Sequence, residues 1–63
     1  MITSRELATT LAALSFWRDE IAQDGNRSAH HYLKSVGMSG VEPLTPDEIE
    51  RLSVKLRSIP VTD

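Results

Sequence analysis

The chain has 63 residues, with seven Lys or Arg against nine Asp or Glu, and no cysteine. This length supports one small domain, which buries only about 60% of the surface of its unfolded chain. The absence of cysteine excludes disulfides and thiolate metal sites. The slightly acidic balance disfavours a general phosphate-binding surface, because such domains are strongly basic. A hydrophobic share of 40% with 25% charged residues is typical of a globular protein.

No targeting signal or membrane span is expected. Residues 1–10 lack the basic segment and following apolar run of a signal peptide. No apolar stretch approaches the roughly 20 residues that cross a bilayer. The sequence therefore predicts a soluble protein without membrane partners, and the lack of cysteine fits a cytoplasmic location.

The first predicted helix covers residues 4–24. Thr3 and Glu6 have the spacing of a capping box, in which each side chain accepts a bond from the other residue's amide. Gly25 can take the left-handed conformation that closes a helix. Apolar residues recur at spacings of three and four and fall on one helical face; they are Leu7, Leu11, Leu14, Trp17 and Ile21.

A second, shorter helix is predicted over residues 27–36. Asn26 or Ser28 is expected to cap its start, and Gly37 to end it. Its apolar residues follow the i, i+3, i+4, i+7 pattern of a buried helix face; they are Ala29, Tyr32, Leu33 and Val36. A helix this short is unstable alone, so packing has to hold it.

The third predicted helix covers residues 46–58. Thr45 and Glu48 form a second capping box, and Pro46 suits the first helical position. Pro60 ends the helix and leaves residues 59–63 as a tail. The apolar face comprises Ile49, Leu52, Leu56 and Ile59. No segment shows the alternation of a strand, so the prediction is one all-α domain of three helices over residues 1–63.

His30 and His31 do not predict a metal site. Neighbouring residues diverge by about 100° on a helix, whereas two ligands on one side stand three or four residues apart. The residues four positions away are poor ligands; they are Asn26, Arg27, Lys34 and Ser35. The hydroxyl residues stand at caps and turns, and no nucleophile–base pair or glycine-rich phosphate loop is present. We expect neither an enzyme nor a metal or other cofactor.

The second helix carries the chain's one locally cationic segment, formed by Arg27, His30, His31 and Lys34. A small nucleic-acid-associated regulator that uses these residues is the alternative function. A solvated helix face is favoured over it, because two permanent charges are few for phosphate binding. The connection from Gly37 to Thr45 is also longer than the turn of a helix-turn-helix motif, and the third helix begins with acidic residues.

Phe16 lies nearly opposite the main apolar face of the first helix, with Ala12 one turn earlier. An aromatic residue beside alanines makes a flat apolar stripe that suits close approach of another helix. The predicted partner-binding residues are Ala12, Phe16, Trp17 and Arg18. The leading hypothesis is a non-enzymatic interaction module that docks through this helix, either on another protein or on itself as a homodimer.

Overall fold

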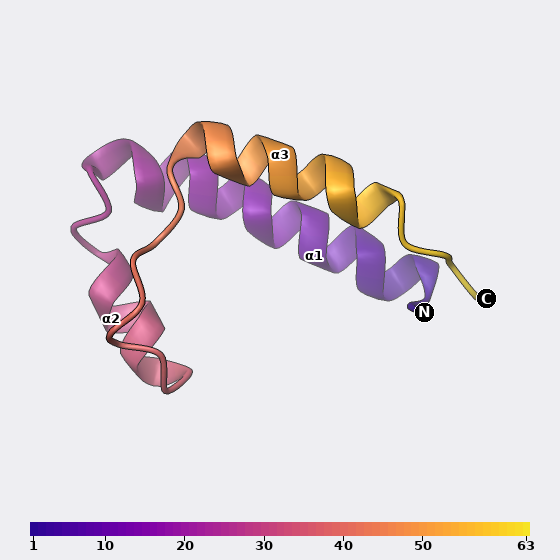
Figure 1. Cartoon of the computed structure of the whole chain (residues 1–63), viewed down its shortest axis with the longest axis horizontal. Helices are drawn as coiled ribbons and strands as arrows, with labels where there is room; N and C mark the ends of the chain where they lie inside the picture. The colour runs from indigo at the N-terminus through magenta and orange to yellow at the C-terminus, as the bar shows by residue number, and fades with distance from the viewer.

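The computed structural model describes residues 1–63 and contains three α-helices: α1 (Ser4–Phe16), α2 (Ala29–Ser35) and α3 (Pro46–Arg57). The all-α prediction is confirmed. α1 and α3 lie side by side and antiparallel, while α2 projects from the end of this pair that is distant from the two termini (Figure 1). We call the α1–α3 pair the hairpin.

The first helical segment is not uniform. A π-helical turn (Trp17–Ile21) and a 3₁₀ turn (Ala22–Asp24) continue α1, so helical structure extends over the predicted residues 4–24. The amide of Ala22 donates to the carbonyl of Trp17, five residues back. Because a π turn accommodates an extra residue, it rotates the residues that follow relative to α1. Gly25 then closes the helix with a φ of 64°, as predicted.

Both predicted capping boxes are present. The amide of Glu6 donates to Thr3 Oγ1 at 3.1 Å, and the Thr3 amide donates to Glu6 Oε1 at 2.8 Å. At α3, the Glu48 amide donates to Thr45 Oγ1 at 3.3 Å and the reciprocal bond is 3.0 Å. These bonds to Thr45, from its amide first, hold the pKa of Glu48 below its usual value. The cap residues therefore fix where α1 and α3 begin.

The core is small and lies at the end of the hairpin nearest α2. Only four residues are buried: Ile21, Ala22, Ala29 and Ile49. The other predicted apolar positions of the first and third helical segments are half-buried; they are Leu7, Leu11, Leu14, Trp17, Leu52, Leu56 and Ile59. The periodicity therefore identified the inward faces of α1 and α3.

The prediction for the second helix was wrong in its packing and its cap. Of its four apolar residues, Ala29 is buried and Leu33 half-buried, whereas Tyr32 and Val36 are 43% and 67% exposed. α2 points away from the hairpin (Figure 1), and Tyr32 and residues 34–36 are exposed.

The start of α2 also differs from the prediction. The helix begins at Ala29 rather than at residue 27, because residues 25–28 form turns. Ser28 occupies the cap position without a side-chain hydrogen bond. Asn26 instead has a φ of 62°, and its amide group donates to the carbonyl of Leu44 at 3.4 Å. A left-handed Asn places its side chain toward the loop before α3 and leaves α2 uncapped.

The predicted tail is attached to the start of the chain. The amide of Thr62 donates to the carbonyl of Ile2 at 2.8 Å, and the Ile2 amide donates to the carbonyl of Pro60 at 3.3 Å. The Ser4 amide donates to Asp63 Oδ1 at 2.8 Å, and the Ser4 hydroxyl donates to Oδ2. These bonds hold the pKa of Asp63 below its ordinary value. The two termini therefore close the open end of the hairpin.

Candidate protein-interaction surfaces

The outer face of α1 is an exposed apolar stripe, as the sequence predicted. Phe16 is 57% exposed, and Ala12 and Ala13 are also exposed. At about 100° per residue, Ala12 and Phe16 lie within 40° of each other and on the opposite side from Leu14, which faces α3. No element of the chain covers this stripe, so it is available to another molecule.

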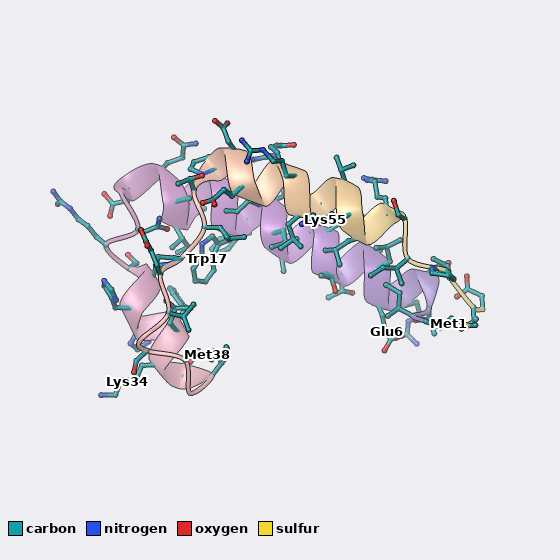
Figure 2. The ribbon with its side chains drawn as sticks, viewed as in Figure 1. Met1, Glu6, Trp17, Lys34, Met38 and Lys55 are labelled. Carbon is teal, nitrogen blue, oxygen red and sulfur yellow. The ribbon has the colours of Figure 1, made fainter.

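Trp17 does not belong to the outer face of α1. It lies where the hairpin meets α2 (Figure 2), and its ring packs edge-on against Tyr32 with the centroids 5.8 Å apart. Edge-to-face aromatic pairs at this distance are favourable. Trp17 therefore joins the π-helical turn after α1 to α2 and lies about 100° around the helix axis from Phe16.

Arg18 is engaged within the chain. Its guanidinium pairs with Asp19 at 2.9 Å and with Glu50 of α3, and it donates to Ser15 Oγ at 3.2 Å. The hydrogen bond to Asp19, followed by the one to Glu50, raises the pKa of Arg18 above its usual value. Ala12, Phe16, Trp17 and Arg18 thus do not form one surface: the first two face outward, Trp17 contacts α2, and Arg18 contacts α3.

The cationic residues Arg27, His30, His31 and Lys34 are all exposed. His30, His31 and Lys34 fall within an arc of about 100° on α2, opposite Ala29 and Leu33. The rings of His31 and Tyr32 are edge-on to each other, with their centroids 5.3 Å apart. His30 instead borders a polar hollow of about 380 Å³ beside the loop from Ser39 to Thr45. No group of three His, Cys, Asp or Glu side chains in the structure could hold a metal ion.

A second exposed apolar surface was missed by the sequence reasoning. It comprises Tyr32, Val36, Met38, Val41 and Leu44, and we call it the elbow surface. Tyr32 and Val36 were assigned to the core, and Met38 and Val41 were treated as loop. The signal in the sequence was the presence of three large apolar residues, Met38, Val41 and Leu44, in the connection between Gly37 and Thr45, where polar residues are usual for a loop.

A hollow of about 250 Å³ adjoins the elbow surface. Its walls come from all three helices through Leu14, Trp17, Leu33 and Ile49, and from the loop at Val41–Leu44. Glu42 is the one charged residue in this lining. Apolar hollows with few polar groups are typical of sites that accept an apolar side chain.

No known protein family, curated protein or solved structure matches this chain. No helix in the structure has both the length and the apolar character needed to cross a bilayer. The fold and the two exposed surfaces are therefore the basis for a functional proposal.

Proposed function

We propose that this chain is a cytoplasmic, non-enzymatic interaction module that docks through the outer face of α1, on itself or on another protein. Ala12 and Phe16 form the contact. Trp17 and Arg18 support it indirectly, because they attach the π-helical turn that follows Phe16 to α2 and α3.

The amount of open surface carries the proposal. The accessible area is 4812 Å², whereas a compact monomer of 7.0 kDa exposes about 4,000 Å². The radius of gyration is 12.6 Å, against about 10.6 Å for a compact chain of this length. The excess of about 800 Å² equals the area that each partner buries in an interface of standard size. An association partner would cover surface that the chain cannot cover itself.

Phe16→Glu tests the role of α1. The wild type is expected to sediment as a dimer or larger assembly at micromolar concentration, and the variant as a monomer with a lower melting temperature. The reason is that burying a charge without a partner is costly. Val54→Glu is the control, since Val54 is 66% exposed on α3. A monomeric wild type whose Phe16→Glu variant melts at an unchanged temperature would contradict self-association through α1.

Binding of nucleic acid through α2 is the second candidate. The observation that favours it is the gathering of His30, His31 and Lys34 on one exposed side of α2, next to Arg27. Affinity for DNA or RNA should then fall steeply with salt, because neutralised phosphates release counterions. An Arg27→Ala, Lys34→Ala double variant should bind all sequences more weakly. No retention of the wild type on DNA or RNA at low salt would reject this candidate.

A further inference from the structure

We infer that residues 27–43, which we call the arm, open as one unit from an intact hairpin and act as a lid on the apolar hollow of about 250 Å³. The arm contains α2 and most of the loop before α3, and it projects from one end of the hairpin (Figure 1). Its connections to the rest of the chain are residues 25–26 and 44–45. The outer face of α1 is not part of the arm, so its opening is independent of the proposed function.

The arm has almost no polar attachment to the hairpin. Its hydrogen bonds all lie within residues 24–44, and neither of the two ion pairs involves it. The one bond across its base runs from the side-chain amide of Asn26 to the carbonyl of Leu44, at 3.4 Å. This distance exceeds the usual length of an N–H···O bond, so the bond is a weak attachment.

The hairpin, in contrast, is held at both ends. Near the arm, Arg18 pairs with Glu50 of α3. At the other end, the Ser4 amide donates to Asp63 Oδ1 at 2.8 Å, and backbone bonds join the first residues of the chain to the last ones. Both long helices also begin in capping boxes, whereas α2 has no side-chain cap. The hairpin therefore keeps its own contacts when the arm opens.

Apolar packing of three residues holds the arm closed. Ala29 is fully buried, Leu33 is half-buried, and the ring of Tyr32 packs against Trp17. A helix of seven residues is not stable by itself in water, so α2 loses its structure when these contacts are lost. Segments with few buried apolar contacts open at a lower free energy than the rest of the same protein.

The turn at the base of the arm has the properties of a hinge. Gly25 and Asn26 both have left-handed backbone conformations, with φ of 64° and 62°. Hinges are formed by a few residues between elements that absorb large changes in φ and ψ. Asn26 Oδ1 is also buried in the closed arm without a hydrogen-bond donor. A buried acceptor without a partner costs stability, which contact with water on opening restores.

Opening of the arm uncovers the adjoining end of the hairpin. Leu14, Trp17 and Ile49 form the walls of the hollow on the side of the hairpin, whereas Leu33 and residues 41–43 form the walls that belong to the arm. Ile49 is 1% exposed in the closed state. Removal of the arm's walls makes Ile49 accessible while α1 and α3 remain paired.

Native-state hydrogen exchange tests the opening. In the wild type, the amides of α2 should be protected at least about tenfold less than those of α3. Low concentrations of urea should accelerate exchange in α2 less than in α3, because opening of the arm exposes less surface than global unfolding. Equal protection and equal urea dependence in the two helices would overturn separate opening of the arm.

Leu7→Ala and Leu33→Ala separate the arm from the hairpin, because each removes a half-buried leucine. Leu7→Ala weakens the hairpin and not the arm, so it should accelerate exchange in α3 by about tenfold and leave α2 unchanged. Leu33→Ala weakens the closed arm, so it should accelerate α2 at least as much as α3. Acceleration of α2 and α3 by the same factor in Leu7→Ala would show that the arm opens only in global unfolding, and would overturn the inference.

A single thiol tests the role of the arm as a lid, since the chain has no cysteine of its own. An Ile49→Cys variant should react with a small disulfide reagent at a rate set by opening of the arm, and adding Leu7→Ala should leave this rate unchanged. A rate that rises with Leu7→Ala as much as exchange in α3 would show that position 49 becomes accessible only on global unfolding. That result would overturn the role of the arm as a lid.

Discussion

Replacing Ile49 by Ala should destabilise this protein more than any other single truncation in α3. Ile49 is 1% exposed and is the largest fully buried side chain. It borders the hollow that Leu14 and Trp17 of the first helical segment share with Leu33 of α2. Truncation at this position therefore weakens the packing of all three helices at once.

The magnitude follows from its burial. Truncating a buried isoleucine to alanine costs about 2–5 kcal/mol, and because the side chain already borders a hollow we expect about 3 kcal/mol. The whole domain is expected to be stable by only about 3–9 kcal/mol, at 0.05–0.15 kcal/mol per residue. The variant should therefore retain a free energy of unfolding of only about 0–6 kcal/mol and unfold at a clearly lower urea concentration than the wild type.

Urea denaturation followed by circular dichroism measures this change, with Val54→Ala as the control. Val54 is 66% exposed on the same helix, so its truncation should change the free energy of unfolding by less than about 0.5 kcal/mol. Both curves should be recorded at one protein concentration, because association with another copy would add to stability. A loss below about 1 kcal/mol for Ile49→Ala would refute the placement of Ile49 at the junction of the helices.

Two further predictions concern the ends of the helices. Thr45→Ala should lower the free energy of unfolding by about 1 kcal/mol, because it removes the cap of α3. Thr62→Ala should have almost no effect, since Thr62 contributes only its backbone amide to the bond with Ile2. Equal losses of stability in thermal melts of the two variants would contradict the placement of the α3 cap at Thr45. Asp63→Asn should lose the pH-dependent part of the stability that the Ser4 bonds provide. The folded-state pKa of Asp63 is depressed, so this contribution is complete above the unfolded pKa of about 3.9 and disappears as the pH falls through the folded-state value. Denaturation of the wild type and of Asp63→Asn between pH 7 and pH 2 measures this contribution. A difference in the free energy of unfolding between the two proteins that is the same at pH 7 and at pH 2 would be evidence against the Ser4–Asp63 contact.

The sequence by itself determined the fold class and the residues at which α1 and α3 begin. A capping box involves residues three positions apart, and the spacing of apolar residues describes one face of one helix. Both patterns can therefore be recognised within a short segment, without knowing how the helices pack. For that reason Thr3 and Thr45 gave the first residues of α1 and α3 correctly, whereas the spacing of apolar residues did not show that the helix after Phe16 changes to a π turn and a 3₁₀ turn. The exposure of Phe16 could also be predicted, because its position around the helix axis is opposite the apolar face.

The tertiary structure decided where α2 lies, and hence which apolar residues remain exposed. The spacing of apolar residues shows that Ala29 and Val36 lie on the same side of the second helical segment. How many residues of that side the hairpin covers depends on the turn at residues 25–28, which sets the direction of α2. The left-handed Gly25 and Asn26 set this turn and direct α2 away from α3. The contacts of Arg18 with Glu50 and of Asp63 with Ser4 could likewise not be predicted from the sequence, since Glu50 and Ser4 are 32 and 59 residues away along the chain. Contacts at that separation depend on how the helices pack, which no local pattern records.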